Sequence, residues 1–141
     1  MLARLRKTSE ENEGGFTLIE LLVVMIIIGI LAAIAIPVFL SQRAKAQDSA
    51  AKADVSTIGK ELATYYVDNT TVPAVTQVAG RYLIAGVDVG KSSTNVVLGA
   101  EVIASATSWC VFVTNPEGDK SKSPGGYKYS AAGGLEAGVC A

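Results

Sequence analysis

The sequence contains no histidine and only two cysteines among its 141 residues. Histidine is the commonest general base and metal ligand, so its absence removes the usual catalytic and metal-binding chemistry. The cysteines, Cys110 and Cys140, stand in neither a CxxC motif nor a zinc-type spacing. We therefore expect no metal site, no cofactor and no enzymatic activity.

The chain also lacks an excess of positive charge. Its formal net charge is -1 at pH 7, and its only Lys/Arg cluster lies in the first few residues. Electrostatic binding of nucleic acids needs concentrated positive charge. We therefore expect the isolated chain to bind no specific nucleic acid. The one phosphate-loop-like stretch, GVDVGKSS at residues 86–93, is one residue short of the required glycine spacing.

The longest feature that is present is an apolar run from Phe16 to Leu40. As an α-helix this run would be about 37 Å long, enough to cross a hydrocarbon layer of about 30 Å. Glu20 is its only charged residue. A charge at the centre of a spanning helix costs roughly 2.5 to 3.5 kcal/mol on insertion scales, so such residues usually have a function. We expect Glu20 to have one.

Gly29 and Pro37 interrupt the apolar run. Glycine lowers helix propensity by about 1 kcal/mol relative to alanine, and proline removes a backbone donor and clashes one turn back. We expect the helix to be weak or kinked between them. The plainer alternative is that both are common residues of membrane helices without a special role.

Residues 41–68 have a different character, with many Ala, Lys, Gln and Glu residues that favour helix. An apolar stripe at helical spacing predicts that this part is amphipathic; the stripe consists of Val55, Ile58, Leu62 and Tyr65. We expect one long helix from Phe16 to about Val67, apolar in its first half and amphipathic in its second.

Residues 69–141 contain short β-prone runs separated by Gly, Asn, Ser and Pro. In one of these runs Trp109, Val111 and Val113 alternate with residues of the opposite face, which predicts a strand. We therefore expect an α+β fold in which a small antiparallel sheet packs against the amphipathic half of the helix. The Gly/Pro-rich loop at residues 115–127 is expected to be exposed.

The segment Gly-Phe-Thr-Leu-Ile-Glu at residues 15–20, followed by an apolar run that contains Gly29 and Pro37, resembles the N-terminus of type IV prepilins. The close match covers about residues 14–45. The amphipathic half-helix, the small sheet and the C-terminal cysteine pair agree more loosely. The acidic residues before Gly15 resemble pilins of high-GC Gram-positive bacteria, whereas the common pattern has Lys or Arg there.

This resemblance implies a leader peptide at residues 1–15, which a dedicated membrane peptidase removes between Gly15 and Phe16. It implies N-methylation of Phe16 and assembly with copies of the same chain into a helical filament, helped by an assembly platform and motor ATPases. The precursor would span the plasma membrane once, and the filament would lie outside the cell. The mature segments would be a filament-core helix half at 16–40, an amphipathic half at 41–68 and a globular region at 69–141.

Under this resemblance the charge of Glu20 has a physical explanation. A chain that begins at Phe16 has a basic α-amino group, and the ammonium group of one subunit could face Glu20 of a neighbour. Their attraction would be strong in an apolar bundle, and a wrong offset would leave two charges unpaired. Glu20 would thus set the register between subunits. The alternative is that Glu20 only occupies the helix N-terminus, where the helix dipole favours an acid.

Cys110 and Cys140 would enclose a loop of about 29 residues as a disulfide, which would stabilise the domain by roughly 3 to 4 kcal/mol. Such a bond needs an oxidising compartment, which a surface protein has. The alternative is two separate buried thiols.

Two other functions remain open. A type II secretion or competence pseudopilin would share the helix and differ in filament length and partners. An ordinary secreted domain is the second, because Ala33–Ala35 fits an A-x-A signal-peptidase site that would leave Ile36 as the first residue. The apolar run is longer than a normal signal h-region and begins with an acid, which argues against this second alternative.

Overall fold

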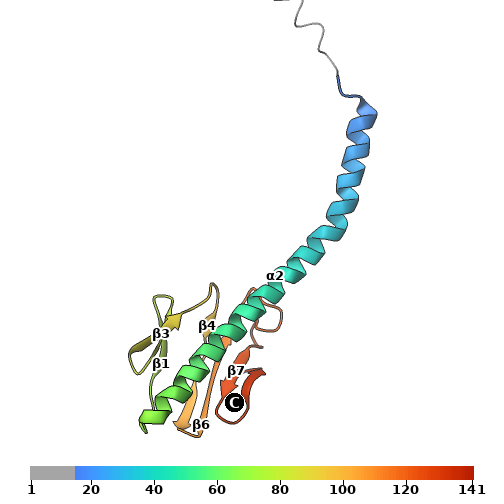
Figure 1. Cartoon of the computed structure of the whole chain (residues 1–141). Coiled ribbons are helices and arrows are strands. Elements are labelled where there is room, and N and C mark those ends of the chain that lie inside the picture. Colours follow the sequence, from blue (N-terminus) through green and yellow to red (C-terminus); the bar gives the residue numbers. More distant parts are fainter. Residues whose placement is uncertain (1–14) are drawn as a thin grey trace, which may run out of the picture. The chain divides into compact units, whose positions relative to one another are not determined.

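The computed structural model describes residues 15–141, so the leader expected at residues 1–15 lies outside the described residues except for Gly15. The chain divides into two compact units, Met1–Phe39 and Leu40–Ala141. One uninterrupted helix, α2 (Leu18–Asp68), contributes to both units (Figure 1). The expected long helix is therefore confirmed.

The part of α2 in the first unit is apolar, and its large side chains are exposed. By length and composition α2 is the one helix among residues 15–141 that could cross a membrane. Gly29 and Pro37 both lie inside the continuous helix. The weakening that we expect between them is not tested by this continuity and stays a prediction.

The part of α2 in the second unit carries the core of the domain. Ala51, Val55, Ile58 and Leu62 are fully buried, at 0% exposure. Three of these belong to the predicted apolar stripe, and the fourth predicted member, Tyr65, is partly buried against the core. The predicted amphipathic pattern is therefore confirmed, because every third or fourth residue faces the sheets.

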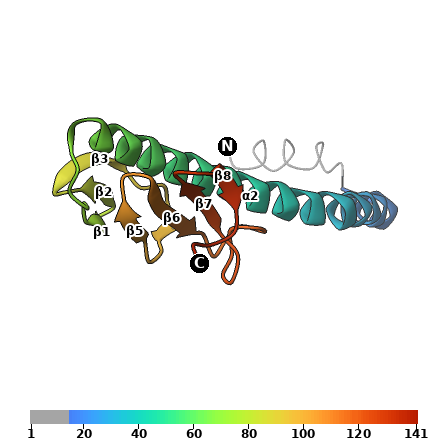
Figure 2. The same ribbon diagram turned by 90° about the horizontal axis from the view of Figure 1, so that it is seen from below.

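Eight strands follow the helix: β1 (Val75–Val78), β2 (Arg81–Ile84), β3 (Val87–Lys91), β4 (Val97–Leu98), β5 (Val102–Ser105), β6 (Ser108–Thr114), β7 (Tyr127–Ser130) and β8 (Gly134–Ala137). They form a three-stranded sheet in the order β1-β2-β3 and a five-stranded sheet in the order β4-β6-β7-β8, in which β5 also pairs with β6. All the pairings are antiparallel. The second half of α2 lies across these strands (Figures 1 and 2).

Strand β6 shows the alternation that its sequence predicts. Trp109, Val111 and Val113 are buried, while the residues between them are only half-buried. Tyr129 on β7 stacks on Trp109, with ring centroids 6.0 Å apart. The Tyr129 ring also lies against Gly59 of α2, in the space that a Cβ atom would occupy. A side chain at position 59 would therefore push the helix away from the sheet.

The sheet arrangement differs from the sequence expectation in one respect. We expected a single small sheet, and the domain contains two. Gln77 of β1 connects them, since its side-chain amide donates to the Val96 carbonyl at 2.9 Å and accepts from the Leu98 amide at 2.9 Å. The Gln77 carboxamide thereby makes the pair of hydrogen bonds that a neighbouring strand would make.

The loop at residues 115–127 also differs from the expectation of exposure. Asn115 and Ser121 are fully buried, and Tyr127 is 3% exposed. Glycine, proline and charge predict a loop correctly, but they do not show which of its polar residues find buried partners. The physical reason for the burial is a set of contacts with α2, described below.

Candidate functional site

The N-terminal segment of α2 begins with two residues that cap each other. The Glu20 carboxylate Oε2 accepts hydrogen bonds from the Thr17 amide at 2.8 Å and from the Thr17 hydroxyl at 2.7 Å. In return, the Glu20 amide donates to the Thr17 hydroxyl oxygen at 3.3 Å. This reciprocal arrangement is a capping box, which satisfies amides that the first turn of a helix otherwise leaves free.

The capping box gives Glu20 a local role within one chain. The carboxylate oxygen Oε2 accepts both hydrogen bonds from Thr17, while Oε1 makes no hydrogen bond among the described residues. Glu20 is also exposed, so its second oxygen can be reached by a partner. The alternative in which Glu20 only occupies the helix N-terminus is thus consistent with the contacts within one chain. Pairing with the Phe16 amine of a neighbour is a contact between chains and stays a prediction.

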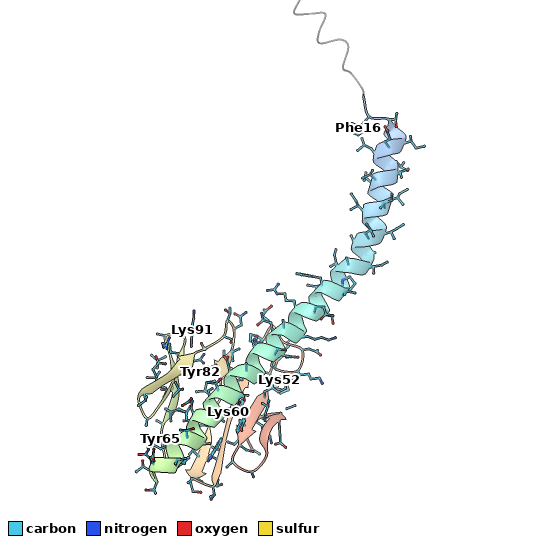
Figure 3. All side chains as sticks on the ribbon, viewed as in Figure 1. Phe16, Lys52, Lys60, Tyr65, Tyr82 and Lys91 are labelled. Atoms are coloured by element: carbon cyan, nitrogen blue, oxygen red, sulfur yellow. A yellow bond between two sulfur atoms is a disulfide. The ribbon has the colours of Figure 1, made fainter. Side chains whose placement is uncertain are left out.

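Gly15 and Phe16 precede the helix, which begins only at Leu18. The Phe16 side chain is 87% exposed at the end of α2 (Figure 3). Among the described residues beyond Phe16, no atom lies within 4 Å of the position that a Cβ of Gly15 would occupy. The bond between them therefore lies outside regular structure, where a peptidase can reach it more easily than inside a helix.

Between Glu20 and Leu40 the helix carries no charged side chain, and apolar side chains project from it in Figure 3. Its leucines, isoleucines and valines and Phe39 are about half to two-thirds exposed, for example 47% at Val23 and 68% at Phe39. A soluble helix buries its apolar stripe, so a helix that is apolar all round needs lipid or other helices around it.

Two acidic residues in the second unit, Asp48 and Asp54, are buried, at 7% exposure each. Asp54 accepts hydrogen bonds from the Tyr82 hydroxyl at 2.9 Å and from the amide and hydroxyl of Ser93 at 2.8 and 2.7 Å. Burial and this hydrogen bond raise the pKa of the Tyr82 hydroxyl, so Tyr82 stays a donor. These contacts hold the β3–β4 connection against α2.

Asp48 has the corresponding role toward the β6–β7 loop. Burial alone would raise the pKa of Asp48, but hydrogen bonds from Ser121 and Lys120 lower it below its ordinary value. The burial of these two acids was not among the sequence predictions. A signal was present, because Asp48, Ala51 and Val55 are spaced so that they share one helix face.

The two cysteines are bonded. Cys110 on β6 and Cys140 form a disulfide, with Cα atoms 5.8 Å apart, which confirms the pairing over the alternative of two free thiols. The bond joins Cys140, which follows β8, to β6, which pairs with β4, β5 and β7 in the five-stranded sheet.

Residues 86–93, which resemble a phosphate loop in sequence, mostly form the extended strand β3 instead. Within residues 15–141 no group of His, Cys, Asp or Glu side chains is arranged to hold a metal ion.

A family model described as the prokaryotic N-terminal methylation motif matches residues 12–36. The type II secretion system core protein G of Pseudomonas aeruginosa is 42% identical over 66 residues, which are 47% of this chain and 46% of that protein. The same protein of Dickeya chrysanthemi is 34% identical over 71 residues, 50% of this chain and 46% of that protein. The chain thus spans about half the length of these relatives.

The type IV wide pilus major component of Thermus thermophilus is 34% identical over 107 residues, which are 76% of this chain and 77% of that protein. No solved structure matches the chain significantly. These relatives lend no support to a high-GC Gram-positive host.

The length of the Thermus alignment is informative, because only 68 residues precede the β-rich region of this chain. The similarity therefore includes part of the strands as well as the helix. The methylation motif, the apolar helix that continues into the domain and the antiparallel sheets are consistent with this match. The chain belongs to the type IV pilin family.

Proposed function

We propose that this chain is a structural pilin subunit that polymerises through the first half of α2 after cleavage between Gly15 and Phe16. The observation that carries the proposal is the exposed apolar surface from Phe16 to Leu40, directly after the start of the methylation motif. An apolar surface of this size is stable in lipid or against copies of itself. The precursor would occupy the membrane and the processed subunit the filament.

Maturation would use the geometry at the helix start. The membrane peptidase would cut the bond between Gly15 and Phe16, which precedes the helix. The new Phe16 amine would be methylated and stay basic. It would then lie one residue before the Thr17 cap, so cleavage would leave the capping box intact.

Assembly would use the second oxygen of Glu20. With Oε2 held by Thr17, Oε1 can accept a hydrogen bond from the Phe16 ammonium of a neighbouring subunit. A charge pair in an apolar bundle fixes one vertical offset, because any other offset leaves both charges unpaired. An assembly platform and motor ATPases would place each subunit, and the filament would extend outside the cell.

The first test is the mass of the mature protein from its native host, compared with the Gly15→Leu variant. A chain that starts at N-methylated Phe16 supports the proposal. A start at Ile36 would show cleavage by signal peptidase and would remove the assembly helix. Gly15→Leu should keep its leader, because a bulky side chain should not fit where the peptidase accepts glycine. Electron microscopy of sheared surface material should show filaments that contain the chain.

A pseudopilin of a type II secretion system is the second candidate. The higher identity, 42%, to core protein G of Pseudomonas aeruginosa favours it. The longer alignment with the Thermus pilus component favours the pilin. Deletion of the gene would separate the two, since loss of surface filaments indicates a pilin. Loss of exoprotein secretion without loss of filaments at native expression indicates a pseudopilin.

A further inference from the structure

The β6–β7 loop makes its polar contacts with a single stretch of α2. The Asp48 carboxylate accepts hydrogen bonds from the Lys120 amide at 3.1 Å, the Ser121 amide at 2.9 Å and the Ser121 hydroxyl at 2.6 Å. These groups come from positions 72 and 73 residues further along the chain. The loop and the helix are therefore joined by contacts between residues that are far apart in the sequence.

Two further contacts join the same loop to the preceding turn of the helix. The Asn115 side chain donates to the Gln47 side-chain oxygen at 2.9 Å, and Glu117 lies 3.8 Å from Arg43. Gly118 passes so close to the helix that a Cβ atom there would collide with Asp48 and Ser121. The loop thus fits tightly around residues 43–48.

The position of these contacts on α2 coincides with a change in burial. Asp48 is the first buried residue of the helix, and the first buried apolar residue, Ala51, comes three residues later. From Phe16 to Gln47 no described side chain is fully buried. Helix turns that pack against nothing open readily, whereas turns tied to a core open only with the core. Among the described residues, the side-chain hydrogen bonds and the ion pair that tie residues 43–48 to the strands and loops come from the β6–β7 loop.

We infer that residues 115–121 act as a clamp that fixes where the rigid part of α2 begins. Opening of the helix turn at Asp48 would leave a carboxylate and the Lys120 and Ser121 amides without partners in a buried place, which is unfavourable. Unwinding that starts near Gly29 and Pro37 would therefore stop before Gln47. The use of this stop during filament assembly rests on the proposed function, but the clamp itself does not.

Hydrogen exchange of the processed full-length subunit in detergent micelles tests the clamp. In Asp48→Asn an NH2 group would replace the carboxylate oxygen Oδ2, which accepts only from the Lys120 amide, and the oxygen that accepts from Ser121 would lose its charge. We expect exchange of the amides at residues 44–48 and 120–121 to become about tenfold faster. The amides of residues 55–62 should be unchanged. The matched control is Asp54→Asn, which loosens the contacts of Ser93 and Tyr82 and should leave residues 44–48 as they are.

Unchanged exchange at residues 44–48 in Asp48→Asn, or equal acceleration in Asp54→Asn, would overturn the inference. If Asp48→Asn does not fold, Ser121→Ala replaces it, because it removes only the hydroxyl donor and keeps the backbone bonds. A smaller acceleration at the same residues supports the clamp, and none refutes it. Filaments are not needed for this measurement, so failure of the proposed function would not affect its result.

Discussion

Thr17 and Glu20 hold each other at the start of α2 through three hydrogen bonds of 2.7 to 3.3 Å. The Glu20 carboxylate thus has hydrogen-bond donors within its own chain, without a contact from another subunit. The capping box gives Oε2 its hydrogen-bond donors and leaves Oε1 available for the proposed contact with a neighbouring subunit. A cap and an intersubunit contact are therefore compatible roles of the same side chain.

Glu20→Ala removes both roles at once. Precursor should still be made and cleaved, but filaments should be absent or scarce, because removal of one partner from a buried ion pair typically costs about 3 to 5 kcal/mol. Glu20→Gln should also assemble poorly, since it keeps the size and the hydrogen-bonding capacity but cannot neutralise an amine. The measurement is electron microscopy of sheared surface material together with an immunoblot for processed subunit in the membrane.

Thr17→Ala is the matched control for the cap. It removes the hydroxyl and leaves the Glu20 charge in place. If filaments are abundant in both Glu20 variants, the pairing account is wrong and Glu20 serves only the helix end. If Thr17→Ala abolishes filaments as completely as Glu20→Ala, the cap itself is what assembly requires.

Replacement of both Cys110 and Cys140 by serine should lower the stability of the domain by about 3 to 4 kcal/mol, because the loop that the disulfide closes becomes free in the unfolded chain. Export and cleavage at Gly15 should survive, since the bond lies in the second unit. Thermal unfolding with and without reductant is the check. Reductant should lower the melting temperature of the wild type and leave the double variant unchanged.

Acid should destabilise the domain partly through Asp48. Its pKa in the folded state lies below the ordinary value. Its stabilising contribution is therefore complete above the unfolded-state pKa and is lost as the pH falls through the folded-state pKa. Asp88, beside Arg81, has a pKa lowered in the same direction and adds to the trend.

Denaturant unfolding of the wild type and of Asp48→Asn, between pH 6 and pH 2, tests this contribution. The wild type should lose more stability over this range than the variant does. Equal slopes of stability against pH would show that Asp48 does not contribute.

Gln77→Glu should weaken the junction between the two sheets. A carboxylate cannot donate to the Val96 carbonyl, and one unsatisfied buried group costs about 1 to 3 kcal/mol. Thr76→Glu is the control, because position 76 lies on the same strand and is exposed. Denaturant midpoints should fall for Gln77→Glu and hardly change for Thr76→Glu. A similar fall in both would mean that negative charge on β1, rather than the lost donor, is responsible.

The parts of the fold that sequence predicts well are those with a strong local period. Val55, Ile58 and Leu62 follow the helical period, and Trp109 and Val111 follow the strand period, so burial could be predicted from neighbours alone. The N-terminal motif likewise lies within a short continuous segment.

The buried polar contacts were not predicted from the sequence, because each depends on a partner that is far away along the chain. Asp48 is buried because Ser121 lies 73 residues away in sequence and beside it in space. The role of Gln77 depends on Val96 and Leu98 in the same way. A single polar residue does not indicate whether such a partner exists, so buried polar residues are assigned to the surface by default.

Within residues 15–141, every buried residue of the hydrophobic core lies at position 51 or later, and the buried acids and the disulfide lie at position 48 or later. This placement indicates where a shortened chain for recombinant production can begin. A shortened chain that begins near residue 41 keeps the whole set of packing contacts and loses the apolar surface that requires detergent. Such a fragment would supply material for crystallisation, antibody production and calorimetry of the domain, and the full-length chain would be needed only for questions of assembly.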